Sequence, residues 1–374
     1  MMGNVIGNGG KLIFHGFDQS EICVARSLVI YEMIKTPASL DSILEVWFST
    51  GWSERTLEEF KAACCNVKKS TQETRLKELI QLWMKTKLSL ADAKRRWFEG
   101  YVQNDWFLAA GNLQYKKDRV EFCRYQLTGQ IFGELQSQCL GNVTMFTRTP
   151  PFEHYQLSAE HFLATFSMSN SLEHAGSFLE SIKRYYKTKL TSFIQLIAEG
   201  KVECSLNVMT VELNNQKAIQ KICSLQPDHI DWNNVADYMK KETFFTLAEA
   251  CSNEETIHSM HFMNWSQIVY GTFILEYENR SEVHAKQKEK LMELFKGCHD
   301  ASMMQFFRKD THIVYPWNAS TDMLALQYRE KFLEYYFDVH GFAINIIDIS
   351  EPELFNCLLR SNQVFDLTFQ ISKV

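Results

Sequence analysis

The stretch from Asp228 to Tyr277, DHIDWNNVADYMKKETFFTLAEACSNEETIHSMHFMNWSQIVYGTFILEY, decides the fold class. Its pattern predicts a short strand, a polar loop, a helix and a second strand. The polar loop, DWNNVAD at 231–237, stands where the first strand ends. In open α/β sheets, ligands collect beyond the carboxyl ends of the strands. The stretch therefore predicts an α/β unit and marks its loop as a candidate site, without indicating a reaction.

The composition is typical of one large or two ordinary globular domains. The chain has 374 residues, of which 45% are hydrophobic and only 6 are proline, so a sizeable core can form. The net charge of −6 argues against a generally basic nucleic-acid-binding surface. Ten cysteines form no CxxC pair, and no signal peptide or apolar run of about 18 residues stands out. We expect a cytoplasmic protein with reduced thiols that does not bind membranes.

The N-terminal part of the chain begins with a tail and a strand–helix pattern. Residues 1–10 are rich in Gly and Asn, which indicates a flexible tail. KLIFHGF at 11–17 predicts a strand that ends at Asp18. A helix is expected over 19–35, with Ser20 as its N-cap.

The rest of the chain continues the α/β pattern around a helical block. Residues 40–140 are mainly helical in pattern, and 174–199 predict a long amphipathic helix ended by Gly200. Further strands are predicted at 204–212, 341–349 and 363–372, the last two as an antiparallel pair at a sheet edge. We expect 11–374 to form a single domain, a three-layer α/β sheet that carries 40–140 as a large helical insertion.

Two separated sets of short motifs resemble one protein family. The first set is Val24-Ala25-Arg26-Ser27 after the Asp-ended strand, and then Ile43, Leu44, Trp47, Phe48 and Ser49. The second is Asn233-Asn234-Val235-Ala236-Asp237 after the strand at 228–231. Together they resemble the uncharacterised domain family often found beside MYND zinc fingers, which is related to the N-terminal half of dynein axonemal assembly factor 3. The Cys/His spacing of a MYND finger is missing from this chain.

The resemblance implies a degenerate Rossmann-like sheet of the methyltransferase type and a role in protein assembly or scaffolding. We therefore expect a non-catalytic factor that works through contacts with other proteins and needs no cofactor. Two departures stand against the family pattern: Ser27 replaces an Asn, and only ten residues precede Lys11. The family places a strand and a Gly-rich turn there, so the sheet is expected to lack its first strands or the chain to be a shortened relative.

The alternative is an S-adenosylmethionine-dependent methyltransferase. This chemistry requires a Gly-rich loop after the first strand and an acidic residue at the next strand end, which binds the ribose hydroxyls. GNGG at 7–10 is a poor loop, because the six residues before it are too few and too glycine-broken for a strand. If a ligand site survives, its cofactor-binding residues are Asp18, Asp231, Asn233, Asn234 and Asp237. The third hypothesis is a module that binds a small metabolite without converting it.

The same residues also have a structural interpretation. Asp18 would place a negative charge at a helix N-terminus, where the dipole favours it. The Asp and Asn side chains of 231–237 would turn the chain and cap the next helix. His258 and His261 invite a metal reading, but positions three apart on a strand face opposite sides, so no metal site is predicted.

Two further clusters have functional and structural readings. The basic run Lys94-Arg95-Arg96 could contact an acidic partner or RNA, or be a solvated helix end. The aromatic side chains that follow form either the core of the helical block or a partner-binding surface. They are Trp97, Phe98, Tyr101, Trp106 and Phe107.

Overall fold

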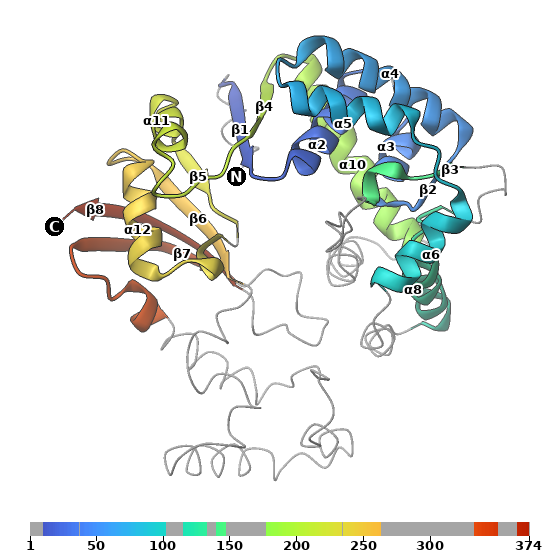
Figure 1. Cartoon of the computed structure of the whole chain (residues 1–374). Coiled ribbons are helices and arrows are strands. Elements are labelled where there is room, and N and C mark those ends of the chain that lie inside the picture. The colour runs from blue at the N-terminus through green and yellow to red at the C-terminus, as the bar shows by residue number, and fades with distance from the viewer. Residues whose placement is uncertain are drawn as a thin grey trace, which may run out of the picture. The chain divides into compact units, whose positions relative to one another are not determined.

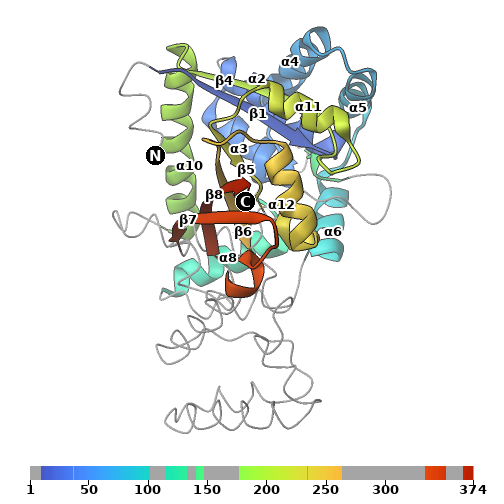
Figure 2. The same cartoon turned by 90° about the vertical axis from the view of Figure 1, so that its left-hand side faces the viewer.

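The computed structural model describes residues 10–36, 38–101, 115–132, 140–146, 177–233, 235–262, 333–350 and 365–373. The chain falls into two compact units, Met1–Val211 and Glu212–Val374, and each is described by itself (Figures 1 and 2). Both units combine helices with small sheets, which confirms the mixed α/β class. The single domain over 11–374 stays a prediction.

The first unit contains one pair of parallel strands. β1 (Leu12–Asp18) pairs with β4 (Val202–Val208), with Leu12 opposite Val202 and Asp18 opposite Val208. A crossover must join parallel strands, and here it is the whole helical block, beginning with α2 (Glu21–Lys35), which contacts both strands. The two predicted strands are confirmed, although β4 starts and ends earlier than the pattern at 204–212 indicates.

Helices make up most of the rest of the first unit. They are α3 (Leu40–Phe48), α4 (Glu54–Ser70), α5 (Thr74–Lys85), α6 (Leu90–Tyr101), α8 (Lys116–Thr128) and α10 (Phe178–Ala198). Ser20, Ser39 and Ser53 each accept a hydrogen bond from the backbone N–H three residues further on, so three helices begin at serine caps. The cap predicted at Ser20 is confirmed. Two short strands, β2 (Gly51–Trp52) and β3 (Leu140–Gly141), pair antiparallel within this block.

A buried polar cluster at the C-terminus of α3 holds the helical block together. The Arg26 guanidinium donates to the carbonyls of Val46 at 2.9 Å and Trp47 at 2.6 Å, and to Thr144 Oγ1 at 3.1 Å. The Asn142 amide donates to the carbonyl of Val46 at 3.0 Å and to that of Ser49 at 2.8 Å. The last carbonyls of a helix have no partner within it, so these side chains supply the missing donors.

The second unit is built on a four-stranded sheet with the order β5-β6-β8-β7. β5 (His229–Asp231) and β6 (Ile257–Phe262) are parallel, whereas β8 (Phe365–Lys373) is antiparallel to both β6 and β7 (Phe342–Ser350). The strand, loop, helix and strand predicted from 228 onward are confirmed, with α12 (Lys241–Ala250) as the helix. The predicted pairing of 341–349 with 363–372 is also confirmed, but of these two strands β7 lies at an edge of the described sheet and β8 lies inside it.

One face of this sheet is packed and the other is polar. His258, Met260 and Phe262 on β6 are buried together with Leu367 and Phe369 on β8. Phe244 and Phe245 of α12 are buried as well, and the ring of Phe245 lies 5.9 Å from that of Phe369. An antiparallel sheet commonly has one solvated face. The opposite face carries His229, Asp231, Ser259 and Thr368, in agreement with that rule.

The hydrogen bonds between described strands do not form one continuous sheet. β1 and β4 belong to one sheet, and β5, β6, β8 and β7 belong to another. A single Rossmann-like sheet therefore stays a prediction. Among the helices in the described ranges, none has both the length and the apolar character needed to cross a bilayer.

Candidate functional site

Asp18 lies at the carboxyl end of β1 and is exposed. Its Oδ1 accepts a hydrogen bond from the Ser20 backbone N–H at 2.7 Å, and its carbonyl accepts one from Met209 N at 2.8 Å. The Ser20 hydroxyl in turn accepts from Cys23 N at 3.4 Å. The Asp18 carboxylate thus helps start α2, as the structural interpretation expects.

Asp231 makes the same kind of turn at the carboxyl end of β5. Its Oδ1 accepts from the Asn233 backbone N–H at 2.9 Å, and Asn233 has a positive φ of 50°. Asparagine tolerates this left-handed conformation better than most residues. The 3-10 helix η3 (Val235–Tyr238) follows at once, with the Val235 N–H bound to the Trp232 carbonyl at 3.1 Å. The polar residues of this loop therefore shape the chain.

The predicted cap of the next helix is not found on these residues. α12 begins after Lys240, whose side chain makes no capping hydrogen bond. Asn234 lies outside the described residues, and Asp237 is placed only as part of η3. Asp18 belongs to the first unit and Asp231 and Asn233 to the second. The structure therefore joins only Asp231 and Asn233 in one described turn.

Trp232 and His258 form a buried pair behind that turn. Trp232 is 5% exposed and His258 is 1% exposed, and the Trp232 Nε1–H donates to His258 Nδ1 at 2.9 Å. The His258 ring also stacks on Phe369, with ring centroids 5.2 Å apart. Burial, with a smaller contribution from His229, lowers the pKa of His258 from 6.5 to about 4. His258 is thus a neutral acceptor inside the core, with its Nδ1 committed to Trp232.

A histidine–serine pair occurs on an exposed part of one sheet in each unit. His229 Nε2 lies 2.8 Å from Ser259 Oγ in the second unit, and His15 Nδ1 lies 2.6 Å from Ser205 Oγ in the first. Such a pair is the start of a nucleophile–base arrangement, which also requires a group that orients the imidazole. Among the described side chains, no carboxylate is hydrogen-bonded to either ring. The recurrence of the pair in two sheets favours ordinary cross-strand contacts.

Sequence reasoning missed these pairs because the partners lie 30 and 190 residues apart. Only the strand register brings them together, and no local motif signals that register. The metal reading of His258 gains no support, since its side chain faces the core on a strand. No group of three potential metal ligands occurs among the described residues.

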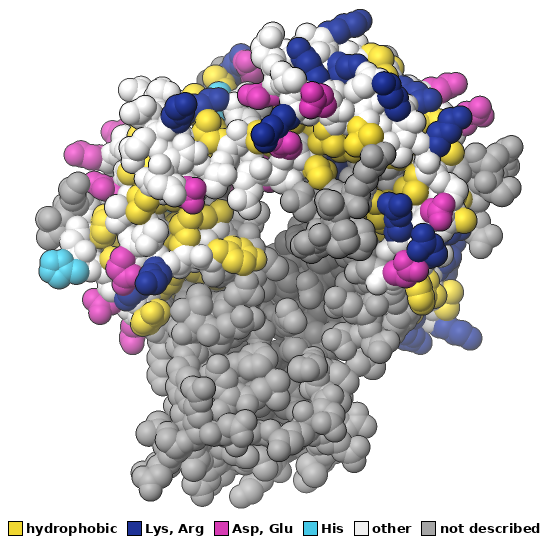
Figure 3. All heavy atoms as spheres, viewed as in Figure 1, with side chains coloured by type: hydrophobic (Ala, Val, Ile, Leu, Met, Phe, Trp, Pro, Cys, Tyr) yellow, Lys and Arg dark blue, Asp and Glu magenta, His cyan; other side chains and the backbone are white. Residues whose placement is uncertain are grey.

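The basic run on α6 is part of a solvated helix surface. Arg95 pairs with Glu99 at 2.9 Å and with Asp92 at 3.5 Å. On the face seen in Figure 3, basic side chains lie over the helices of the first unit with acidic ones among them. The aromatic residues after the basic run differ in burial. Trp97 is buried, and its Nε1–H donates a hydrogen bond to the Gln126 carbonyl at 2.7 Å, whereas Phe98 is 53% exposed. The side chains of the rest of that cluster lie outside the described residues.

No protein family model, curated protein or solved structure matches this chain.

Proposed function

We propose that the protein is a non-catalytic interaction factor that helps to assemble larger protein complexes on a degenerate methyltransferase-like fold. The observation that carries the proposal is the role of the two aspartates at the carboxyl ends of β1 and β5. Asp18 and Asp231 each accept a backbone N–H two residues further on. Residues that a cofactor would need are thus engaged in turns. In this proposal the protein needs no cofactor, and its partners are other proteins of the cytoplasm.

The strand order of the second unit supports the fold part of the proposal. A parallel pair, β5 and β6, is followed by an antiparallel strand, β8, which lies between β6 and β7. Many doubly-wound folds likewise carry an antiparallel strand in an otherwise parallel sheet. The parallel pair of β1 and β4 in the first unit is also compatible with such a sheet.

The experiment is an affinity purification of the full-length chain after mild cross-linking, compared with an unrelated protein of similar size and charge. We expect a small, reproducible set of protein partners. Repeated recovery of no specific partner would refute the proposal.

One observation favours the methyltransferase alternative. Asp18 is exposed at the carboxyl end of a parallel strand, which is where such an enzyme holds the cofactor ribose. Calorimetric titration with S-adenosylmethionine tests this directly. We expect no heat of binding; heat that disappears in the Asp18→Asn variant would support the enzyme instead.

A further inference from the structure

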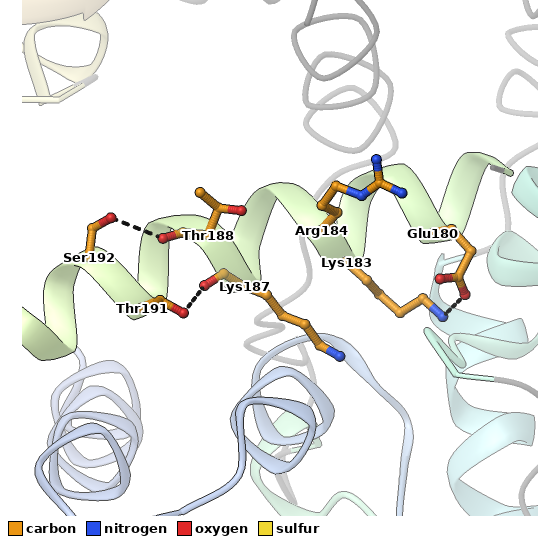
Figure 4. A pocket seen from close by; sticks show the side chains of 7 residues that line it. All are labelled: Glu180, Lys183, Arg184, Lys187, Thr188, Thr191 and Ser192. Carbon is orange, nitrogen blue, oxygen red and sulfur yellow. Dashed lines mark hydrogen bonds and ion pairs between the residues drawn. The ribbon is translucent and has the colours of Figure 1, made fainter. Parts of the chain in front are cut away.

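Figure 4 shows a hollow of about 470 Å³ along α10, whose lysines are already paired within the chain. Lys183 pairs with Glu180, and Lys187 pairs with Asp41. Because an acidic side chain of the same chain lies beside each of these cations, the hollow indicates no particular ligand.

A pair of cysteines in the second unit gives a more specific signal. Cys223 lies in the last turn of α11 (Gln216–Ser224), and Cys251 is the C-cap of α12. Each stands six positions before a residue of the next strand, and these two residues, His229 and Ile257, are partners in the parallel register of β5 and β6. The cysteines thus occupy equivalent places in two consecutive helix–strand pairs that lie side by side.

A hydrogen bond joins the two helices at the level of these cysteines. The Cys223 thiol donates to the Ala250 carbonyl at 2.7 Å, and Ala250 directly precedes Cys251. In a trans peptide the carbonyl oxygen lies about 3 Å from the next Cα, so Cys223 Sγ lies no more than about 6 Å from Cys251 Cα. A disulfide requires Cα atoms about 4–7 Å apart, a separation that this contact allows.

The loops that follow the two helices are also held together. Thr256 Oγ1 donates to the Pro227 carbonyl at 2.8 Å, and the Ile257 N–H donates to the Asp228 carbonyl at 3.0 Å. The helices α11 and α12 themselves are in contact. A bond between the two sulfur atoms therefore requires rotation of the two side chains rather than movement of the helices.

The two thiols differ in their access to solvent. Cys223 is exposed, whereas Cys251 is 0% exposed. Burial, with a smaller contribution from Cys223, raises the pKa of Cys251 to about 12. Cys223 is therefore the thiol that a dissolved oxidant meets first. An accessible cysteine with a second cysteine beside it is the arrangement that redox-sensing pairs use.

We propose that Cys223 and Cys251 form a reversible disulfide that closes when the surrounding glutathione becomes oxidised. The Cys223 thiolate attacks one sulfur of glutathione disulfide, whose S–S bond breaks, and one glutathione leaves as a thiolate. The Cys251 thiolate then attacks Cys223 Sγ, and the second glutathione leaves. Each protein thiol gives its proton to solvent and each departing glutathione takes one up. Two protein thiols are thus oxidised while one glutathione disulfide is reduced.

The disulfide would close a ring over residues 223–251. This ring contains β5, the turn formed by Asp231 and Asn233, and α12. Closing it removes conformational freedom from the unfolded chain and fastens α11 to α12. Oxidation should therefore stabilise the second unit and slow the opening of the turn. Transient disulfides of this kind occur in cytosolic proteins whose other thiols stay reduced.

The test is peptide mapping of the folded full-length chain after incubation with mixtures of reduced and oxidised glutathione. Free thiols are blocked, and the protein is digested with trypsin without reductant. Cleavage after Lys221, Lys240 and Lys241 places the two cysteines on separate peptides, 222–240 and 242–280. We expect mass spectrometry to find these two peptides joined as the main internal disulfide, and a reductant to separate them.

Three variants provide the controls for the mapping. Cys223→Ser should abolish the linked peptide, and Cys251→Ala should leave Cys223 as a mixed disulfide with glutathione. Cys65→Ser removes another exposed thiol and should form the linked peptide at the wild-type yield. The inference is overturned if Cys223 takes up glutathione but never links to Cys251, if it links to other cysteines equally often, or if the link forms only in urea.

A second measurement tests the effect on the turn. Oxidised wild type should have a urea midpoint about 1–2 M above that of the reduced protein, and its amides within 222–240 should exchange hydrogen at least about threefold more slowly. Cys251→Ala should show neither change, and Cys223→Ser, at an exposed position, gives the same comparison if the buried substitution disturbs folding. A disulfide that changes neither the midpoint nor the exchange rates would refute its effect on the turn.

Discussion

Lowering the pH from 7 to 4 should destabilise the second unit by about 3 kcal/mol through His258 alone. The folded state holds this ring neutral between Trp232 and Phe369, with a pKa lowered from 6.5 to about 4. In the unfolded chain the ring takes up a proton below about pH 6.5. The unfolded state therefore binds more protons than the folded state between pH 6.5 and 4.

The sign follows from that difference in bound protons. Above pH 6.5 His258 is neutral in both the folded and the unfolded state, and its contribution to the stability of the folded state is complete. As the pH falls from 6.5 to about 4, stability is lost, and below about 4 both states are protonated, so the loss from this group levels off. Since His258 is 1% exposed, solvent screening reduces the effect little.

The assay is urea unfolding followed by tryptophan fluorescence at several pH values between 7 and 4. The informative variant is His258→Asn, whose side-chain oxygen can still accept the Trp232 Nε1–H but does not titrate. Its stability should fall about 3 kcal/mol less than that of wild type over this range. His340→Asn, at an exposed position, is the matched control and should follow wild type. Equal losses in wild type and His258→Asn would refute the reasoning.

Three further predictions concern the turns and the polar cluster. Gly129→Ala should destabilise the protein by about 2–4 kcal/mol, because φ is +63° and the new Cβ would lie 2.2 Å from Thr50 Cγ2. Gly200→Ala has a similar φ of +68° but nothing within 4 Å of the new Cβ, so it should cost only about 1 kcal/mol. Thermal unfolding of the two variants measures the difference. Arg26→Met should cost about 3 kcal/mol in urea unfolding, since the Trp47 carbonyl loses its donor and the Val46 carbonyl keeps only Asn142, and a loss below 1 kcal/mol would contradict the described contacts. Asp231→Ala should cost about 1 kcal/mol and leave partner recovery unchanged if the residue only shapes its turn; selective loss of a partner would show a binding role.

Local signals in the sequence predicted much of the fold. Ser20 marks the start of α2, and the pattern from 228 onward gives β5, α12 and β6. These features depend on neighbours within a few residues. The exact end of β4 was not predicted, because its length is set by the pairing with β1, nearly two hundred residues away.

The candidate site was predicted only in part for the same reason. The turn role of Asp231 could be inferred from its neighbours, and its hydrogen bond to Asn233 N confirms it. The capping role is not found at α12, because that helix begins after Lys240, whose side chain makes no capping hydrogen bond. Arg26 was noted as a motif residue, but its contact with Thr144 spans 118 positions and follows from the packing of the helical block.

The place of β8 in its sheet has a consequence for how the protein is made. β8 lies between β6 and β7 although it follows both in the sequence. During synthesis, β6 and β7 therefore leave the ribosome before the strand that joins them exists. Until then each has an open edge whose backbone groups can pair with another chain. A chain interrupted before Phe365 should therefore aggregate rather than fold into a smaller sheet, and newly made protein should depend on protection at this stage.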